Sequence, residues 1–410
     1  MLKIFISAGE HSGDLLGAYL IKALKNELDT QNHIDFQGVG GPLMESEGFK
    51  NLFNFSLLSV MGIKDILVNF FPIFKILRQA YKYNIAWEPD LIITIDAPEF
   101  NLRLASLIKK QWKNAKIVHY VLPSVWAWRQ GRVKILKKNF DHILSILPFE
   151  SEFLQNFHIK CDFVGHPIST NVLPKTRDVV SFKRSLNIKD STKIVTLLPG
   201  SRISEVKRML PIFLDTAYSL SEKFSDIIFI CPTPSIVSKI FREIAAERSI
   251  KVKQISAETM SNTEFEKDKM SLYACSDLAL VTSGTVVLEL AKSSVPMVVG
   301  YRTGFLTQII YRLFVNVSSA NLVNLITKSN NIPEFLFHRC NSKNLYSEAE
   351  KILGKKKYAQ AQLISSKQAI RELGYGSKDP AIRAAKSIKN LSTFFAFLTN
   401  LFLIIFNFFR

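Results

Sequence analysis

The stretch FISAGEHSGDLLGAYLIKAL, residues 5–24, decides the fold class because it contains a strand, a tight turn and a helix in immediate succession. The apolar run from Leu2 to Ile6 predicts a buried strand, and Gly9 and Gly13 then bend the chain. Apolar residues return at helical spacing at Leu15, Leu16, Tyr19, Leu20, Ala23 and Leu24. This order of elements is typical of the opening unit of a nucleotide-binding α/β domain.

The polar side chains of this turn do not suit a phosphate. Free backbone N–H groups at a helix N-terminus favour an anion. The turn, however, also carries the carboxyl groups of Glu10 and Asp14, beside His11 and Ser12. Because carboxylates repel a pyrophosphate, we expect a neutral, hydroxyl-rich ligand at this turn.

Apolar runs alternate with helical patterns along the chain and predict further buried parallel strands. These runs are DLIITID (90–96), KIVHYVL (116–122), HILSILP (142–148), KIVTLLPG (193–200), DIIFICP (226–232), DLALVTSG (277–284) and VPMVVGY (295–301). The pattern loosens after residue 168, which predicts an α/β protein with two Rossmann-like, doubly wound domains facing a cleft. We place these domains at 1–170 and 171–375, followed by a helix at 376–390 and an apolar tail at 391–410.

The composition indicates a folded and strongly basic protein. The 410 residues are 47% hydrophobic and carry a net charge of +18, which argues against disorder and favours a polyanionic partner. No dense basic run alternates with aromatic residues, so nucleic acid is not the expected partner; scattered lysines that solubilise the surface are the alternative explanation. The cysteines form no CxxC pair and indicate neither a metal site nor a disulfide framework, as in a reduced, cytoplasmic setting. They are Cys161, Cys231, Cys275 and Cys340.

Two segments have the character of membrane-contacting helices. Residues 60–82 combine an apolar and a basic face, a pattern typical of a helix on an anionic membrane, and Pro72 is expected to bend or split them. The apolar face is Ile63, Ile66, Leu67, Phe70, Phe71, Phe74 and Leu77, and the basic face is Lys75, Arg78 and Lys82. Residues 391–409 carry no charge. The length of this segment is close to the about 20 apolar residues that a helix needs to span a bilayer. An ordinary core helix and a helix buried in an oligomer are the respective alternatives.

Asp96 is the first candidate for chemistry. It directly follows a predicted buried strand in the segment IDAPEFN (95–101), and Pro98 stiffens the turn. A carboxylate at the end of such a strand is well placed to act as a general base. Capping of the next helix is the alternative role, because aspartate is a common N-cap.

Two turns in the second half have the pattern of phosphate-binding turns. Gly200, Ser201 and Arg202 follow a predicted strand and precede a helix, where backbone N–H groups and a guanidinium can hold an anion. A second turn at a helix start contains Ser283, Gly284 and Thr285, and Glu289 one helical turn later can accept hydrogen bonds from ribose hydroxyls. Together they predict a nucleotide diphosphate site. An arginine paired with Glu205 and an ordinary capped helix are the alternatives.

The segment HYVLPSVWAWRQGRVKILKK (119–138) gathers aromatic and basic side chains after another strand. His119, Trp126, Trp128 and Arg129 suit a wall that faces a sugar or a lipid, although the tryptophans also fit a packed core. The chain contains no DxD triplet and no HExxH motif, so we expect no metal and no other cofactor.

These motifs, taken in order, resemble those of lipid-A-disaccharide synthase from the N-terminus to about residue 388. They are SAGEHSGDLLGA, GVGGPLM, VMGI, IDAPEFN, PSVWAWR, LPFE, GHP, LLPGSRISEV, SGTVVLELA and PMVVGYR. The resemblance implies a glycosyltransferase fold of the B type. It implies an inverting transfer that joins UDP-2,3-diacylglucosamine to 2,3-diacylglucosamine 1-phosphate and yields the β-1,6 lipid A disaccharide 1-phosphate and UDP. It also implies a protein peripheral to the cytoplasmic face of the inner membrane, in a family whose members can form homodimers. The apolar tail at 391–410 lies outside the resemblance, and its composition alone indicates a membrane anchor.

The resemblance assigns roles to individual residues. It implies an essential carboxylate at Asp96, a phosphate-contacting arginine at Arg202 and an essential asparagine at Asn324. It implies UDP contacts at Gly200, Ser201, Arg202, Ser283, Gly284, Thr285 and Glu289. The acceptor side would comprise Glu10, Ser12, Asp14, His119, Trp126 and Arg129, of which the first three would meet sugar hydroxyls or hold the Asp96 loop.

Two rival functions remain open at this point. A UDP-sugar 2-epimerase shares the two-domain fold and the phosphate turns, but it acts on one soluble sugar nucleotide and needs no apolar membrane face. A non-catalytic basic protein that binds membranes or polyanions would tolerate loss of Asp96 and show steeply salt-dependent binding.

Overall fold

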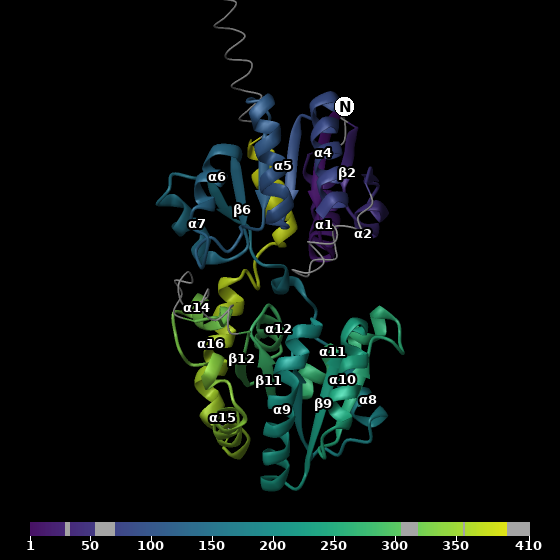
Figure 1. The fold of residues 1–410 in the computed structure, drawn as a ribbon, viewed down its shortest axis with the longest axis vertical. Helices are drawn as coiled ribbons and strands as arrows, with labels where there is room; N and C mark the ends of the chain where they lie inside the picture. The colour runs from purple at the N-terminus through teal and green to yellow at the C-terminus, as the bar shows by residue number, and fades with distance from the viewer. Residues whose placement is uncertain (29–32, 54–69, 305–318, 356, 392–410) are drawn as a thin grey trace, which may run out of the picture. The chain divides into compact units, whose positions relative to one another are not determined.

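The computed structural model describes residues 1–28, 33–53, 70–304, 319–355 and 357–391. Within them the chain forms two compact α/β units (Figure 1). The first unit comprises Met1–Ser169 together with the C-terminal segment from Gly376, and the second comprises Thr170–Tyr375. Both ends of the chain therefore contribute to the first unit, and the second unit is inserted between them in the sequence.

The first unit is built on a parallel seven-stranded sheet with the order β3-β2-β1-β4-β5-β6-β7. Its strands are β1 (Leu2–Ala8), β2 (Ile34–Val39), β3 (Lys50–Asn51), β4 (Leu91–Ile95), β5 (Ile117–Tyr120), β6 (His142–Ser145) and β7 (Cys161–Phe163). Its described helices are α1 (His11–Glu27), α2 (Pro42–Ser46), α4 (Phe70–Trp87), α5 (Pro98–Gln111), α6 (Arg132–Asn139), α7 (Pro148–Gln155) and a helix at residues 380–391. The strand order reverses between β1 and β4, and ligands of doubly wound sheets bind at the carboxyl ends of such strands.

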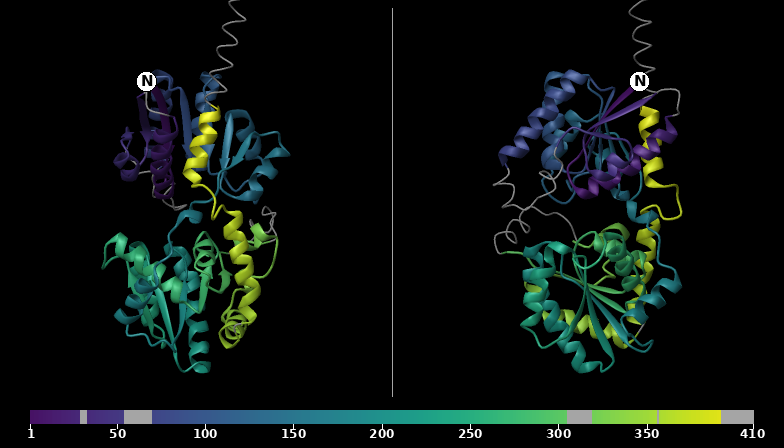
Figure 2. Two further views of the ribbon diagram at one scale, coloured as in Figure 1. Left: turned by 180° about the vertical axis from the view of Figure 1, so that it is seen from behind. Right: turned by 90° about the vertical axis from the view of Figure 1, so that its right-hand side faces the viewer.

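The sheet of the first unit is buried on both faces, as a parallel sheet must be. Ile4 and Ile6 of β1 pack with α1 and the helix at 380–391, whereas Phe5 packs on the opposite face with α4 and α5. Ile388 of the C-terminal helix is 1% exposed in the first of these clusters. Figure 2 shows this helix in yellow beside the N-terminal strands that it covers.

The second unit is built on a parallel six-stranded sheet with the order β10-β9-β8-β11-β12-β13. Its strands are β8 (Lys193–Leu198), β9 (Ile227–Thr233), β10 (Val252–Ser256), β11 (Leu278–Thr282), β12 (Met297–Tyr301) and β13 (Glu334–Leu336). Its described helices are α8 (Thr176–Ser185), α9 (Ile203–Lys223), α10 (Ser235–Ala246), α11 (Asn262–Cys275), α12 (Val286–Lys292), α14 (Leu322–Thr327), α15 (Ser342–Gly354) and α16 (Lys357–Glu372). A short helix, η2 (Pro167–Thr170), leads from the first unit into the second. The strand order here reverses between β8 and β11.

These sheet orders confirm the prediction of two Rossmann-like, doubly wound α/β halves. Each apolar run that predicted a strand contains one, because a strand buried on both faces needs an unbroken apolar sequence. β4 ends at Ile95, one residue before Asp96.

Helix α4 is the described part of the segment that we expected Pro72 to bend or split. The helix runs from Phe70 to Trp87 without interruption. Pro72 lies in its first described turn, where the missing N–H group removes no intrahelical hydrogen bond. Residues 60–69 of the predicted amphipathic segment lie outside the described residues.

The apolar residues that we expected on one face of α4 do not all point to the same side of the helix. Leu77 is buried together with Ile76 and Ala80, and these side chains pack against the sheet. Phe74, which we expected beside Leu77, is 52% exposed. The core-facing stripe of α4 therefore leaves Phe74 on the outer surface of the helix.

None of the helices in the described ranges is long and apolar enough to cross a bilayer. The predicted anchor at 391–410 lies outside the described residues except for Leu391, which packs against the core of the first unit.

Candidate active site

The turn after β4 has a rare backbone conformation. Asp96 and Ala97 have φ angles of 49° and 43°, in the left-handed region that non-glycine residues seldom adopt. The turn after β1 lies close to this turn. If Gly9 carried a Cβ atom, that atom would lie only 2.8 Å from the Cβ of Ala97. The two turns at the switch point of the first sheet are therefore in contact, and Gly9 is the residue that permits it.

Asn101 holds this turn in place from the second turn of α5. Its Nδ2 donates to the carbonyl oxygens of Asp96 at 2.7 Å and Ile95 at 3.0 Å. Its Oδ1 accepts a hydrogen bond of 2.7 Å from Oγ of Ser7 in β1. Asn101 and Ser7 are both completely buried, so the hydrogen bonds are protected from water. They fix the direction in which Asp96 leaves the sheet.

The carboxyl group of Asp96 is partly buried and lies beside the turn that follows β1. Burial raises the pKa of Asp96, while hydrogen bonds from the Ala97 N–H and the Ser12 hydroxyl act in the opposite direction. Ser12 thus holds the Asp96 loop, which is one of the two roles proposed for it. Glu10 is half-buried at the N-cap of α1.

Asp14 has a different role from the one expected. Its side chain is 0% exposed and its carboxylate accepts hydrogen bonds from the backbone N–H groups of Gly41, Leu43 and Met44 at 2.9–3.1 Å. These are the free donors at the N-terminus of α2, whose own N-cap is Gly41 and has no side chain to offer. The prediction that Asp14 contacts a sugar is therefore wrong: it caps a neighbouring helix.

His119 is likewise a structural residue. It is 0% exposed, its Nδ1 lies 2.7 Å from Oγ1 of Thr94 in the adjacent strand, and its ring packs on Phe140. Burial lowers the pKa of His119 to about 3, so the imidazole is neutral. The prediction that it contacts the acceptor is wrong because its side chain points into the sheet packing and not beyond the strand end.

Sequence reasoning missed Glu150, which positions Trp126. Glu150 is 1% exposed, accepts a hydrogen bond of 3.1 Å from the Trp126 indole, and caps α7 through the N–H groups of Ile146 and Leu147. Burial raises the pKa of Glu150 to about 8 despite these donors. The available signal was the LPFE segment, where a glutamate follows a proline in the first helical turn. Arg129 lies in the same loop region as Trp126, and its guanidinium pairs with Glu99.

The second unit brings the predicted nucleotide-binding residues together. A pocket of about 420 Å³ opens at the carboxyl ends of β8, β9 and β11. All the residues expected to contact UDP line it, namely Gly200, Ser201, Arg202, Ser283, Gly284, Thr285 and Glu289. The pocket lies at the switch point of this sheet, which is where such folds bind ligands.

A carboxylate of the protein occupies the anion-binding turn after β8. Glu205 Oε2 accepts hydrogen bonds from the N–H groups of Ser201 and Arg202 at 3.2 and 3.3 Å. Its Oε1 lies 3.3 Å from Nη1 of Arg202, whose side chain is 72% exposed. The structure thus contains the pairing of Arg202 with Glu205 that the sequence left as an alternative, within a turn that also faces the pocket.

Lys269 connects two carboxylates on the opposite wall of the pocket. Its ammonium lies 3.3 Å from Glu289 and 2.7 Å from Glu266. Although burial acts to lower the pKa of Lys269, the two carboxylates outweigh it and the pKa is raised. The ammonium therefore stays charged and holds Glu289 at the pocket wall.

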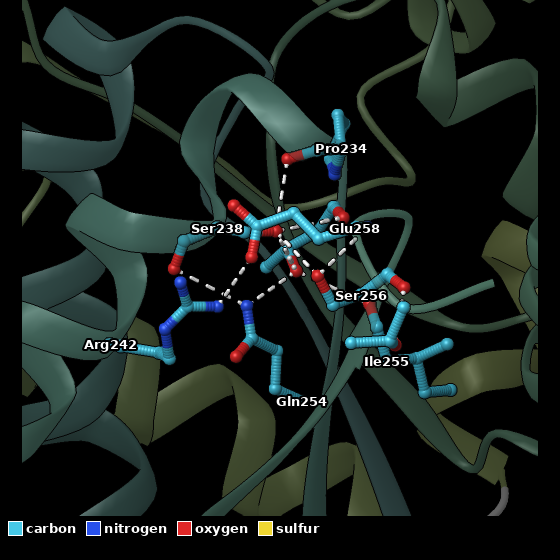
Figure 3. A network of polar contacts seen from close by, with 9 residues as sticks. Pro234, Ser238, Arg242, Gln254, Ile255, Ser256 and Glu258 are labelled. Atoms are coloured by element: carbon cyan, nitrogen blue, oxygen red, sulfur yellow. Dashed lines mark hydrogen bonds and ion pairs between the residues drawn. The ribbon is translucent and has the colours of Figure 1, made fainter.

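A network of buried hydroxyls supports the third wall, formed by Pro232 and Pro234 (Figure 3). Ser238 Oγ donates to the carbonyl oxygen of Pro234 at 3.3 Å and contacts Oγ of Ser256 at 2.7 Å. Gln254 donates to Oγ1 of Thr233 at 2.7 Å. These bonds tie the turns after β9 and β10 together and fix the proline wall.

The structure does not support Asn324 as a residue in contact with substrate. It is 3% exposed, and its amide both donates to the carbonyl oxygen of Ile332 at 2.9 Å and accepts from the Ile332 N–H at 3.1 Å. The prediction is wrong because this buried asparagine pairs with a neighbouring backbone segment through both the nitrogen and the oxygen of its amide.

Asn321 is a better candidate that the motif comparison missed. Its Oδ1 caps α14 through the Val323 N–H, while its Nδ2 is buried without a partner among the described residues. The turn that carries it is held by Glu334, which accepts from the Ala320 N–H at 2.8 Å. Ser283 of the pocket donates to the Ala320 carbonyl at 2.6 Å, so the turn that carries Asn321 is joined to a residue that lines the pocket.

All four cysteines are free thiols. Within the described ranges, no group of three or more histidine, cysteine, aspartate or glutamate side chains is arranged to hold a metal ion.

Comparison with known proteins places the whole chain in one family. A family model described as lipid-A-disaccharide synthetase matches residues 4–387. The lipid-A-disaccharide synthase of Ruegeria pomeroyi is 34% identical over 389 residues, which covers 95% of this chain and 95% of that protein.

Solved structures with the same fold are more distant. A putative UDP-N-acetylglucosamine 2-epimerase from Listeria monocytogenes has a TM-score of 0.62 at 14% identity and covers 95% of this chain and 96% of its own. A complex of S. aureus MnaA with UDP has a TM-score of 0.62 at 13% identity and covers 97% of this chain and 98% of its own. At these identities the likeness establishes the fold alone.

We predict that Asp14→Ala destabilises the first unit. The substitution leaves three N–H groups without this acceptor, those of Gly41 and Met44 in buried positions, and should lower the free energy of unfolding by about 2 kcal/mol or more. Urea denaturation measures this, and Asp14→Asn, which keeps one acceptor oxygen, should lose less. An unchanged unfolding midpoint would contradict the capping role.

We predict that Gly284→Val blocks the pocket without disturbing the fold. A Cβ atom at Gly284 meets no atom within 4 Å and points into open space, so the added side chain fills volume that a ligand would need. UDP affinity should fall by about tenfold or more, at roughly 1.4 kcal/mol per factor of ten, with little change in melting temperature. Gly354→Val is the matched control, because Gly354 also faces open space outside the pocket. Equal UDP affinities of the two variants would contradict the prediction.

Proposed function

The chain belongs to the lipid-A-disaccharide synthetase family, and we propose how its residues carry out the family reaction. The enzyme is a glycosyltransferase that forms the lipid A disaccharide. It joins UDP-2,3-diacylglucosamine to 2,3-diacylglucosamine 1-phosphate and releases UDP. The second unit binds the UDP-sugar and the first unit binds the acceptor.

The pocket of the second unit is the observation that carries this assignment. Residues expected to contact UDP come from the turns after β8 and β11, and they line one pocket. Glu289 would accept hydrogen bonds from the ribose hydroxyls, and Gly284 leaves open space for the ligand. The diphosphate would take the place that the Glu205 carboxylate occupies on the turn, so Arg202 would exchange one anion for another.

Asp96 is the proposed general base. Its carboxylate takes the proton from the 6-hydroxyl of the acceptor as that oxygen attacks the anomeric carbon of the donor. A new C–O bond forms on the face opposite to the breaking bond, and UDP leaves with the electron pair of that bond. Arg202 stabilises the negative charge that develops on the departing diphosphate. Because the pKa of Asp96 is raised by burial, the carboxylate is a stronger base than an exposed aspartate.

The family's asparagine corresponds to Asn321 in this proposal. Its Nδ2 is buried and lacks a partner among the described residues, so it is able to donate a hydrogen bond to a substrate. Asn324 is replaced in this role because its amide is already paired with Ile332.

We further propose that the enzyme works at the cytoplasmic surface of the inner membrane. Phe74 is exposed on α4, and Lys75, Arg78 and Lys82 are exposed on the same helix, a combination that suits an anionic bilayer. The net charge of +18 supports the same partner. Residues 391–410 would add an anchor, and the family's homodimer would apply here too.

The direct test is an assay of the reaction itself. Purified protein is incubated with UDP-2,3-diacylglucosamine and 2,3-diacylglucosamine 1-phosphate, and the products are examined by mass spectrometry. Formation of the disaccharide 1-phosphate together with UDP supports the proposal. Turnover of the UDP-sugar without an acceptor would instead indicate an epimerase or a hydrolase.

We predict that Asp96→Asn nearly abolishes turnover while UDP binding is retained, because the amide has no basic oxygen but keeps the size of the side chain. Steady-state kinetics and calorimetric titration with UDP measure the two properties. Substantial residual turnover would count against the role of base.

The pH dependence of the reaction should report Asp96. Its raised pKa predicts that activity is lost on acidification at a pH above the usual range for aspartate, about 3.9. Ser12→Ala removes a hydrogen bond that stabilises the carboxylate, so the pKa should rise further and the acidic limb of kcat/KM should move to higher pH. A limb that stays in place would exclude Asp96 as the titrating group.

We predict that Arg202→Ala slows turnover by roughly a hundredfold or more, since loss of a preorganised charge of this kind costs about 3 kcal/mol of barrier. Arg208→Ala, in the helix that follows Arg202 but outside the residues that line the pocket, is the control in the same steady-state assay. Equal rates for the two variants would exclude Arg202 from stabilising the leaving group.

A further inference from the structure

Three arginines surround one carboxylate next to the Asp96 turn. Glu99, in the first turn of α5, forms a hydrogen bond with Nη2 of Arg132. The Nη1 atom of Arg129 lies 2.8 Å from the same oxygen, and Nη2 of Arg103 lies 3.6 Å from the other one. The arginines come from α5, from the loop after β5 and from the start of α6. We refer to Glu99, Arg103, Arg129 and Arg132 as the arginine cluster.

The charges of this cluster do not balance. Three guanidinium groups face one carboxylate, which leaves an excess of two positive charges among the described residues. Burial acts to raise the pKa of Glu99, but the three arginines outweigh it and lower the pKa, so the carboxylate is ionised. A phosphate monoester carries a charge of about −1.5 to −2 at neutral pH and would neutralise the excess.

The guanidinium groups are held in place and still reach solvent. The Cζ atom of Arg129 lies 4.2 Å from the centre of the Trp128 ring, a cation–π contact that orients its planar head. The side chain of Arg132 is only 17% exposed, whereas those of Arg129 and Arg103 are 48% and 63% exposed. A guanidinium carries more N–H donors than one carboxylate oxygen accepts, so the cluster is able to bind a second anion.

The position of the cluster points to the acceptor. Glu99 follows Asp96 by three residues and lies in the first turn of α5, directly after the turn that carries Asp96. In the acceptor, one sugar ring separates the 6-hydroxyl from the phosphate on carbon 1. Building on the proposed function, we infer that Arg103, Arg129 and Arg132 bind the 1-phosphate of the acceptor while Asp96 receives the proton from its 6-hydroxyl.

A phosphate in an anionic lipid headgroup is the other source of the same chemistry. The headgroup of phosphatidylglycerol is a phosphodiester with one negative charge, which would leave the excess only half neutralised. The nearness of the cluster to Asp96 also has no explanation in headgroup binding. We therefore assign the site to the phosphate of the acceptor.

The test compares two acceptors that differ only in the phosphate. Values of kcat/KM are measured with diacylglucosamine 1-phosphate and with diacylglucosamine, for the wild type and for Arg103→Gln, Arg129→Gln and Arg132→Gln. Each variant should raise KM for the phosphorylated acceptor by about tenfold or more, as expected for loss of a charge-assisted hydrogen bond. The values for the unphosphorylated acceptor and KM for the UDP-sugar should stay unchanged, so the preference for phosphate falls.

Arg248→Gln is the matched control, because Arg248 is an exposed arginine in an ion pair with Asp215, in the second unit. It should keep the phosphate preference of the wild type. Melting temperatures identify variants that fold poorly. The more exposed Arg103 and Arg129 keep the test decisive should the less exposed Arg132 be needed for folding.

The outcomes separate this inference from the proposed function. A wild type that forms no disaccharide overturns the proposed function. Disaccharide formation with an unchanged phosphate preference in all three variants overturns the inference alone. Calorimetric titration with glucosamine 1-phosphate and glucosamine gives an additional readout that does not depend on turnover: only the phosphorylated sugar should bind, and the variants should weaken it.

Vesicles test the headgroup alternative. Binding to vesicles of phosphatidylglycerol and phosphatidylcholine is measured by sedimentation for the wild type and the three variants. The inference expects similar vesicle binding throughout. Loss of vesicle binding combined with an unchanged phosphate preference would assign the arginine cluster to lipid headgroups and overturn the inference.

Discussion

The geometry of the first unit depends on the hydrogen bonds that Asn101 of α5 makes to the turn after β4 and to Ser7 of β1. Two successive residues, Asp96 and Ala97, adopt left-handed conformations, each of which costs about 1–3 kcal/mol in a side-chain-bearing residue. Asn101 offsets this cost by binding the carbonyl oxygens of the turn and the hydroxyl of Ser7, with both side chains fully buried. The result is a carboxylate that projects from the strand end at a fixed angle, with Gly9 leaving just enough room for the turn.

The anion-binding features of both units are occupied by carboxylates of the protein. Glu205 is bound to the turn after β8, Glu99 to the arginines of the arginine cluster, and Glu289 to Lys269. At the turn after β8 the diphosphate would therefore replace Glu205, whereas at the arginine cluster the 1-phosphate would join Glu99 as a second anion. The exchange at the turn after β8 lowers the net gain on binding, because the diphosphate must compete with an ion pair that is already formed. It also keeps the basic groups oriented before the substrates arrive, and it returns them to a paired state when UDP leaves.

The sequence predicts the parts of the molecule that follow from local pattern, and the structure supplies those that depend on distant neighbours. Apolar periodicity identifies the strands, and the carboxyl ends of parallel strands meet at one edge of a sheet. The sequence therefore predicts that residues directly after strands, such as Asp96 and Ser283, lie at these edges, and the structure confirms this position. Asp14, His119 and Asn324 were misjudged because each is satisfied by a segment that sequence spacing does not reveal: a helix start, a neighbouring strand and a backbone loop. Polarity alone does not distinguish a side chain that meets substrate from one that replaces a missing backbone partner.

The return of the C-terminal helix to the first unit has a consequence for how the protein is made. Thr170–Tyr375 is continuous in sequence, so this half is able to fold as soon as it leaves the ribosome. The N-terminal half is synthesised first, yet one face of its sheet is covered by residues 380–391, with Ile388 in its core. The part of that face covered by this helix stays open to solvent until residues 380–391 have been translated. The half that begins synthesis is thus the last to be completed, and during that interval its apolar surface is exposed to chaperones, aggregation and proteases.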